Sequence, residues 1–312
     1  MLGHLLYQFT SLLITLLIVI SMVFFGMRVL PGDPAVILGG LDATEQQIQN
    51  LRRSLGLDEP LVVQYGIYLS SLAQGDLGVS WRQARPVSAI LAERLPVTLL
   101  LASSAFVLFL ALGLALGLAS GLNPGSLADR AIRAYTTVGL SLPEFWIAFV
   151  LILLLSVKLA WFPFIGYPTE DSLPERLYFL ALPALTLAIP RSAQLARLVR
   201  ASLIEELSAD YIRTARSKGL SKRSLRQHVA RNALPGTFPL IALELGGLLT
   251  GVIIVEQVFS LPGLGLALLG SIGARDYAVV QGVAILAVIV YTGVNWLADV
   301  ALVMADPRVR YQ

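Results

Sequence analysis

The stretch PVTLLLASSAFVLFLALGLALGLASGL, residues 96–122, contains no charged side chain. A helix needs roughly 20 predominantly apolar residues to cross the hydrocarbon core of a membrane, because each residue adds about 1.5 Å of length. Residues 96–122 meet this requirement, and Asn123-Pro124-Gly125 follow as a turn signal that ends the helix. The stretch therefore predicts a transmembrane helix and places the chain among integral membrane proteins.

The composition of the whole chain agrees with this interpretation. Of its 312 residues, 56% are hydrophobic and only 14% are charged, whereas a soluble domain has roughly 25% charged residues. There is no cysteine, which excludes disulfides and thiolate chemistry. Most basic residues lie beside apolar runs, so the net charge of +3 favours orientation in a membrane over binding to nucleic acid.

Working outward from residues 96–122, the sequence predicts an all-α fold with about six transmembrane helices. The predicted ranges are 1–30, 96–122, 134–157, 177–199, 234–259 and 279–304. We expect the first helix to be retained, because no small-residue cleavage site follows it. Pro143-Glu144 interrupts the third helix. The fourth is long enough only if it extends past Pro190, so Arg191 should face protein or water rather than lipid.

Basic residues give the orientation of these helices. A cytoplasmic loop is predicted at 200–233, because this region carries a strong excess of arginine and lysine over acids. Its basic residues, with those of the preceding helix end, are Arg197, Arg200, Arg213, Arg216, Lys218, Lys222, Arg223, Arg226 and Arg231. With six spans, the basic residues of the tail 305–312 fall on the same side, so both termini are predicted to be cytoplasmic.

A small extracytoplasmic segment is then expected at residues 31–95. Within it, residues 45–57 read as a helix with Thr44 as its N-cap, and residues 61–72 read as a second helix. The sequence Gly75-Asp76-Leu77-Gly78 reads as a turn.

The cytoplasmic loop itself predicts two short helices with a sharp turn between them. Basic side chains near residue 216 complement the dipole at the end of the first helix, and Gly219 provides a left-handed stop. Ser221 can cap the second helix, in which Leu225 and Val229 share a side. Such an element, tied at both ends to membrane helices, can dock in a groove on another protein. The alternative is a basic loop that only sets topology or touches anionic lipid.

Charged residues at membrane depth are costly and often functional. Glu244 is the deepest carboxylate and is predicted to line a translocation path. Glu144 should line the kink after Pro143, and Arg191 should pair with an acid or line the cavity. The nearby glycines Gly246, Gly247 and Gly251 are expected to permit close helix packing.

The inventory of reactive groups argues against an enzyme. The chain has no Gly-x-x-x-x-Gly-Lys-Ser/Thr phosphate loop, so any ATP must be hydrolysed by another subunit. Its two histidines, His4 and His228, lie outside the predicted membrane helices and form no His-Glu-x-x-His motif. We therefore expect no catalytic residue, no metal site and no cofactor in this chain.

Residues 211–220, YIRTARSKGL, resemble the cytoplasmic signature of the inner-membrane permeases of ABC importers, specifically the dipeptide/oligopeptide/nickel subfamily. Many of these permeases have Glu-Ala-Ala at the start of the signature; here Arg213-Thr214-Ala215 replaces it, as is usual in the peptide subfamily, and Gly219 matches. Further matches in the same order extend over most of the chain. They are Pro31-Gly32-Asp33-Pro34, LGLDEPL at 55–61, Gln64-Tyr65, GDLGVS at 75–80, Ser141-Leu142-Pro143 with Phe145-Trp146, Glu256 with Phe259, Pro262-Gly263-Leu264-Gly265 and Asp306-Pro307-Arg308.

The resemblance implies a type I ABC importer permease fold and a transport subunit for dipeptides or oligopeptides. The implied partners are a second permease subunit, two ATP-binding subunits that hold ATP and Mg²⁺, and an extracytoplasmic solute-binding protein. This chain would be the first permease of the pair, in the bacterial inner membrane. Its coupling helix would contact an ATPase subunit through Asp210, Tyr211, Ile212, Arg213, Thr214, Ala215, Arg216, Lys218, Gly219 and Leu220.

Three alternatives to a peptide importer stay open at this stage. Nickel or another small solute, such as a glutathione-like molecule, could be the cargo of the same machine. An ion-coupled secondary transporter would need carboxylates near mid-membrane and often repeated halves; only Glu244 is well placed, and no repeat is evident. A membrane scaffold without a transport role is the third.

Overall fold

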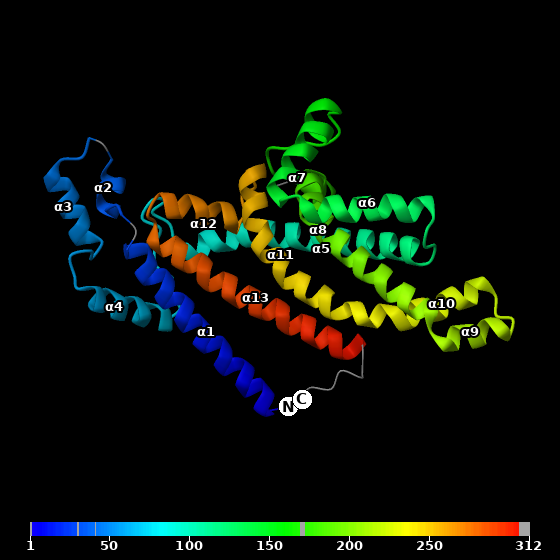
Figure 1. The fold of residues 1–312 in the computed structure, drawn as a ribbon. Helices are drawn as coiled ribbons and strands as arrows, with labels where there is room; N and C mark the ends of the chain where they lie inside the picture. Colours follow the sequence, from blue (N-terminus) through cyan, green and yellow to red (C-terminus); the bar gives the residue numbers. More distant parts are fainter. Residues whose placement is uncertain (1, 30, 41, 169–171, 306–312) are drawn as a thin grey trace. The chain divides into compact units, whose positions relative to one another are not determined.

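The computed structural model describes residues 2–29, 31–40, 42–168 and 172–305, and the side chains of residues 10–298 and 300 within them. The described residues form helices joined by turns and loops, with one isolated bridge between Val79 and Pro86. They divide into two compact units, Met1–Thr98 with Pro262–Thr292 and Leu99–Leu261 with Gly293–Gln312. Figure 1 shows the helices in chain order. Helices α5 (Val87–Gly121) and α13 (Tyr277–Ala305) contribute residues to both units. The predicted all-α fold is confirmed.

Five described helical segments are long and apolar enough to cross a membrane, and a bent pair of helices can supply a sixth span. The five are Thr10–Val29 within α1 (Leu2–Val29), α5, α8 (Leu173–Ser208), Lys222–Phe259 and Tyr277–Ala298 within α13. This agrees with the expected number of about six. The predicted tail and the motif Asp306-Pro307-Arg308 lie outside the described residues.

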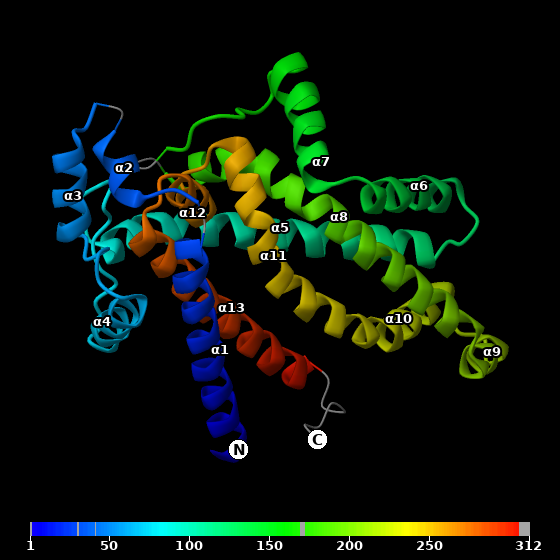
Figure 2. The same ribbon diagram turned by 60° about the vertical axis from the view of Figure 1, so that its left-hand side comes forward.

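The bent pair differs from the single interrupted helix predicted at 134–157. Helix α6 (Leu127–Ser141) ends before Pro143, and α7 (Glu144–Leu151) leaves at 116° and continues as a π-helical segment, Ile152–Lys158 (Figure 2). Leu142 and Pro143 are extended, and the proline ring cannot continue α6. Helix α6 begins before the span predicted from about residue 134, because Ser126 caps it by accepting a bond from the Asp129 N–H.

Other helices extend beyond their predicted apolar ranges. Helix α5 begins at Val87 rather than 96, and α8 spans Leu173–Ser208 rather than 177–199. A capping box at Ser172 and Glu175 begins α8. The physical reason is that an apolar run marks only the part of a helix inside the membrane. The helix itself continues into polar surroundings until a cap ends it. The segment predicted at 234–259 divides into a 3₁₀ turn, Leu234–Thr237, and α11 (Phe238–Phe259).

The first unit contains the segment between α1 and α5. Helices α3 (Glu45–Ser54) and α4 (Leu61–Ala73) confirm two predictions, and Thr44 caps α3 in a reciprocal capping box with Gln47. Helix α4 lies beside the second half of α1 (Figures 1 and 2), where the Tyr65 hydroxyl is 2.6 Å from the Ser21 hydroxyl. The short helices α2 (Pro34–Gly39) and α12 (Leu264–Gly273) complete this unit.

Helix α8 forms the centre of the second unit, where it packs against α6, α7, α10 and α11. It also approaches α5 closely at Gly113, Gly117 and Gly121. A Cβ atom added at these glycines would lie 2.7, 2.6 and 2.7 Å from side-chain atoms of Leu195, Val199 and Leu203, respectively. Glycine at every fourth position therefore permits this close approach, as in other membrane helix pairs.

Candidate functional site: a helix–turn–helix element and a buried ion cluster

Helices α9 (Asp210–Ser217) and α10 (Lys222–Ala233) form the predicted helix–turn–helix element. Gly219 has φ +79°, the left-handed conformation that glycine adopts without strain. Its N–H donates to the Arg216 carbonyl at 3.0 Å, and the Leu220 N–H donates to the Ala215 carbonyl at 3.2 Å. These two bonds make a Schellman motif, so the predicted left-handed stop is confirmed.

The second helix of this element begins at the predicted cap. The Ser221 hydroxyl accepts a bond from the Ser224 N–H at 3.2 Å. Leu225 and Val229 are both buried, because residues four apart lie on one side of a helix. The prediction that they share a side is confirmed.

The apolar side of the element is anchored in the core of the second unit. Ile212, only 1% exposed, belongs to one buried cluster with Leu203 of α8 and with Val229. Full burial of such a side chain contributes about 1.5–3 kcal/mol. Of the residues predicted for coupling, Ile212 therefore faces inward, and Ala215 is partly buried against the same cluster. The exposed ones are Asp210, Tyr211, Arg213, Thr214, Arg216, Lys218, Gly219 and Leu220.

Polar contacts also hold the element to the end of α8. The Tyr211 hydroxyl donates to Glu206 Oε2 at 2.5 Å and accepts a bond from the Asn232 side chain at 2.9 Å. Partial burial, together with the hydrogen bond to Glu206, raises the pKa of Tyr211, so the phenol remains protonated near neutral pH. Tyr211 therefore links α8, α9 and α10 while 40% of its surface stays exposed.

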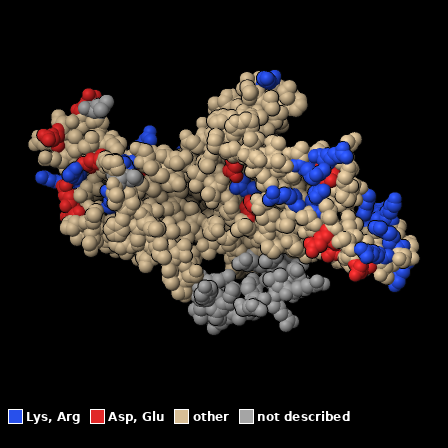
Figure 3. All heavy atoms as spheres, in the orientation of Figure 1, with Lys and Arg blue, Asp and Glu red and all other residues tan. Residues whose placement is uncertain are grey.

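The outer surface of the element is basic. Figure 3 shows lysine and arginine side chains gathered at the end of the second unit formed by α9 and α10. The exposed basic residues of α9, α10 and the turn between them are Arg213, Arg216, Lys218, Lys222, Arg223, Arg226 and Arg231. Here "coupling surface" denotes the exposed residues of α9 and its C-terminal turn, namely Asp210, Tyr211, Arg213, Thr214, Arg216, Ser217, Lys218, Gly219 and Leu220.

A buried ion cluster lies elsewhere in the same unit, among α7, α8 and α11. Arg191 Nη1 donates to Glu144 Oε1 at 2.6 Å. Arg191 Nε lies 3.3 Å from Glu244 Oε2, close enough for an ion pair but not aligned for a hydrogen bond. The three side chains are 10%, 23% and 14% exposed, in the order Arg191, Glu144 and Glu244. The structure therefore brings together all three residues predicted for the translocation path.

Local backbone features position the members of this cluster. Glu144 is the first residue of α7, so the bend at Pro143 directs it toward α8. Gly251 of α11 leaves the necessary room, because an added Cβ would lie 2.8 Å from both Arg191 Nη2 and Glu144 Oε2. The Gly247 carbonyl accepts a bond from Arg191 Nη2 at 3.3 Å. The sequence prediction for these glycines was incomplete, because Gly247 also contacts the guanidinium directly.

The cluster has one cation and two carboxylates. Removing such charges from water costs several kcal/mol per ion before their mutual attraction is counted. Glu144 and Glu244 share one guanidinium, and all three side chains are mostly buried. Ionisable groups kept at membrane depth in this way are typical of solute pathways.

Helix α8 connects the cluster to the helix–turn–helix element. Arg191 and Leu203 lie on the same uninterrupted helix, about 18 Å apart along its axis. Pro183 and Pro190 are inside this helix. Because Pro190 has no N–H to donate to the preceding turn, it weakens α8 next to Arg191 and favours bending there.

Another buried carboxylate, Asp129, was not predicted from the sequence as a site residue. Asp129, at the start of α6, is fully buried. It accepts bonds from Arg200 Nε at 2.7 Å, from the Ser120 hydroxyl at 2.5 Å and from the Gly125 N–H at 2.9 Å. The available signal was the Ser126-x-x-Asp129 spacing at a helix start, which marks the cap but not the long-range partner Arg200.

The geometry defines a class of protein: a multi-pass membrane protein in which one long helix, α8, joins a basic helix–turn–helix element to an ion cluster. Comparison with known sequences specifies the family. The family described as binding-protein-dependent transport system inner membrane component matches residues 113–311, and its N-terminal component matches residues 1–102. The chain belongs to this family. It is therefore a transport subunit rather than an enzyme, as predicted from its residues.

Similar proteins agree with this assignment. The chain is 41% identical, over 95% of both sequences, to a Brucella abortus protein named "Putative peptide transport system permease protein". It is 37% identical, over the full length of both, to the glutathione transport system permease protein GsiC of Escherichia coli K12. The resemblance to peptide-subfamily ABC permeases is thus confirmed. A solved structure of the MetNI methionine ABC transporter matches the fold, with a TM-score of 0.53, 19% identity, and coverage of 70% of this chain and 96% of that chain.

Proposed function

We propose that this permease imports peptides as one of two homologous permease subunits, and that its coupling surface docks on an ATP-binding subunit. Two such subunits would bind ATP and Mg²⁺ and supply the energy. An extracytoplasmic solute-binding protein would deliver the cargo. The family assignment supports an importer in general, and the packing of α9 and α10 supports the site of docking.

One observation carries the docking proposal. The element exposes a short basic helix ended by Gly219, while its opposite side packs through Ile212 onto α8. A force applied to the exposed side is therefore passed to the helix that holds Arg191. A loop that only sets topology has no need of this apolar anchor.

The ion cluster is the proposed part of the translocation path in this chain. Arg191 pairs with Glu144 and Glu244 in the state described. A peptide carries a cationic and an anionic terminus, and a site with both charges can exchange its internal ion pairs for pairs with such a solute. Bending of α8 at Pro190 would move Arg191 relative to the two carboxylates and so permit or prevent this exchange of ion pairs.

The proposed orientation places the coupling surface and both termini in the cytoplasm and residues 31–95 outside. The excess of basic residues around 200–233 supports it. Nickel or another small solute remains the alternative cargo. The name of the E. coli relative, a glutathione permease, favours a peptide-like solute over a metal.

The test is site-specific photocrosslinking in the complete transporter. Photoreactive residues at Tyr211 and Leu220, which are 40% and 37% exposed, should give adducts with an ATP-binding subunit. Val138 on α6 is 55% exposed and serves as the matched control, which should give lipid adducts. Lipid adducts at all three positions would refute docking, and ion-driven uptake by the chain without any ATPase would refute the importer.

A further inference from the structure

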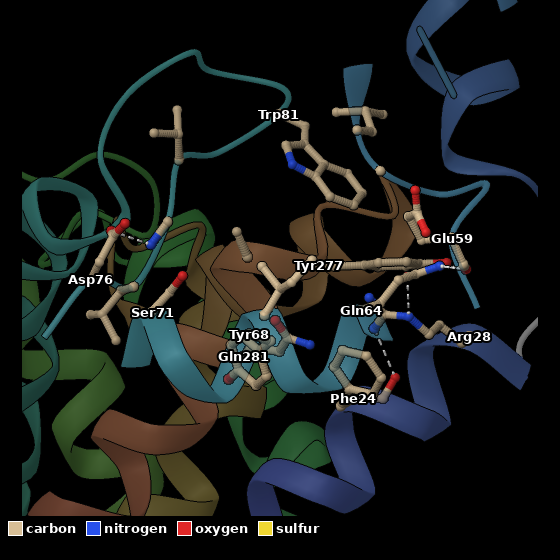
Figure 4. Close-up of a pocket in the computed structure, with 17 residues that line it drawn as sticks. Phe24, Arg28, Glu59, Gln64, Tyr68, Ser71, Asp76, Trp81, Tyr277 and Gln281 are labelled. Atoms are coloured by element: carbon tan, nitrogen blue, oxygen red, sulfur yellow. Dashed lines mark hydrogen bonds between the residues drawn. The ribbon is translucent and has the colours of Figure 1, made fainter. Parts of the chain in front are cut away.

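A cavity of about 240 Å³ lies in the first unit, where α1 completes its apolar run (Figure 4). Its walls come from α1, α4, the start of α13 and the loops around residues 55–59 and 76–81. Pockets that enclose drug-sized ligands have roughly 300–1,000 Å³. This cavity is therefore suited to a smaller group.

Two buried polar atoms in the cavity wall have no hydrogen-bond partner. Gln281, on α13, is only 6% exposed, and its Nε2 is unpaired. The Tyr68 hydroxyl on α4 is also buried and unpaired. Buried donors without partners destabilise a protein and are rare in native structures. Both residues line the same cavity, which points to an acceptor that occupies it.

Arg28 adds a positive charge to these donors. Its guanidinium carbon lies 3.4 Å from the ring centre of Phe24 and 5.1 Å from that of Tyr277. Its Nε donates to Gln64 Oε1 at 3.0 Å and its Nη1 to the Phe24 carbonyl at 3.1 Å. Neither bond uses Nη2. A guanidinium held by two aromatic rings is well placed to bind an oxyanion.

The cavity also contains negative charge, so a simple anion does not match it. Glu59 and Asp76 both line it. Figure 4 shows Arg28 on one side and Asp76 on the other, with Tyr68 and Gln281 between them. A matching ligand has an oxyanion at one end and an ammonium group at the other.

The position of the cavity relative to α1 indicates the source of such a ligand. Arg28 is in the last turn of a helix whose segment Thr10–Val29 can span a membrane, so it lies at the depth of lipid headgroups. Ile67, which lines the cavity, is 58% exposed, and the neighbouring Val63 and Phe25 are 44% and 41% exposed. An apolar surface suited to acyl chains therefore continues from the polar cavity.

We propose that this cavity binds the headgroup of a zwitterionic phospholipid with a primary ammonium, such as phosphatidylethanolamine. Its phosphate oxygens accept bonds from Arg28, Tyr68 and Gln281, and its ammonium faces Asp76 on the opposite side of the cavity. A primary ammonium suits this carboxylate because it donates hydrogen bonds, which a choline headgroup cannot do. A bound lipid would stabilise the packing of α4 against α1 and α13.

The test uses the full chain within its complete transporter, reconstituted in vesicles of phosphatidylethanolamine and phosphatidylglycerol. Native mass spectrometry then counts the lipids retained after extraction. Tyr68→Phe and Gln281→Leu should each reduce retained phosphatidylethanolamine about tenfold, since each removes a hydrogen bond to a charged group. Retention of phosphatidylglycerol should not change.

Tyr65→Phe on the same helix is the matched control. Tyr65 does not line the cavity, and its hydroxyl bonds to Ser21. This variant should lower the thermal midpoint but keep the bound lipid. In phosphatidylcholine, Tyr68→Phe should leave the midpoint unchanged, because its hydroxyl has no partner to lose. Tyr65→Phe thus lowers the thermal midpoint without losing lipid, whereas Tyr68→Phe loses lipid without lowering the midpoint in phosphatidylcholine. This contrast separates ligand binding from damage to the fold.

Four results would overturn the proposal. The first is equal retention of phosphatidylethanolamine in all variants. The second is retention of phosphatidylcholine as strong as that of phosphatidylethanolamine. The third is saturable binding of the free zwitterion alanyl-alanine to the protein in phosphatidylcholine, abolished by Gln281→Leu, which would identify a solute pocket instead. If no lipid is retained at all, the cavity holds only water and the proposal also fails.

Discussion

Replacing Gly219 by valine should uncouple ATP hydrolysis from transport. Gly219 has φ +79°, and no atom lies within 4 Å of the position of an added Cβ. The substitution therefore causes no collision, and its effect is confined to the backbone. A residue with a Cβ pays about 1–2 kcal/mol in the left-handed region, and a β-branched residue tolerates it least.

This strain is comparable to the stabilisation that anchors α9. Burial of Ile212 contributes about 1.5–3 kcal/mol. A strain of about 1–2 kcal/mol at residue 219 shifts the equilibrium between the attached and the detached form of this turn by a factor of roughly 5–30. We expect the ATP hydrolysed per solute transported to rise several-fold, with nearly normal assembly. The assay measures both rates on the same reconstituted vesicles, with the solute-binding protein present.

Gly75 offers a matched control. It also has φ +79° with no atom within 4 Å of an added Cβ, but it lies in the first unit, after α4. Gly75→Val should therefore cause a similar loss of stability without altering the coupling ratio. Gly219→Asn, which tolerates the left-handed conformation, should restore coupling. A normal ratio in Gly219→Val, or an equal rise in Gly75→Val, would refute the reasoning.

Three further outcomes are expected. Gly117→Leu places a Cβ 2.6 Å from Val199 on α8. It should lower the free energy of unfolding by about 1–3 kcal/mol, measured as a lower thermal midpoint. Gly270→Leu places its Cβ in open space and should leave the midpoint unchanged. Arg191→Leu leaves two partly buried carboxylates without a cation and should lower the free energy of unfolding by about 3–5 kcal/mol. Arg191→Lys should keep the thermal midpoint closer to normal yet reduce transport, measured by solute uptake. Tyr211→Phe loses one bond to α8 and one to α10. It should raise ATP use per solute about fivefold or more, because the two bonds together contribute about 1–3 kcal/mol.

Local signals in the sequence determined much of the helix–turn–helix element. Gly219 as a stop and Ser221 as a cap act through bonds within a few residues of themselves. Such bonds form wherever the local backbone permits them, so spacing alone predicts them. The same holds for Thr44 at the start of α3. The inward position of Ile212 was not predicted, because it depends on contact with Leu203 of another helix.

The ion cluster shows the opposite case. Glu144, Arg191 and Glu244 were chosen because charge is rare at membrane depth, and nothing in their spacing indicates that they meet. Their contact depends on the bend of 116° between α6 and α7 and on the missing side chain of Gly251. Both are set by packing among helices distant in the chain.

The sequence by itself determined that the chain is a helical membrane protein with a basic helix–turn–helix element that is stopped at a glycine. Uncharged runs, prolines and caps act locally, so they can be interpreted without knowing their neighbours. Only the tertiary structure decided which charges pair, how closely α5 approaches α8 at its glycines, and where a polar cavity forms beside Arg28. These features arise from long-range packing, in which each side chain's environment is supplied by segments remote in sequence.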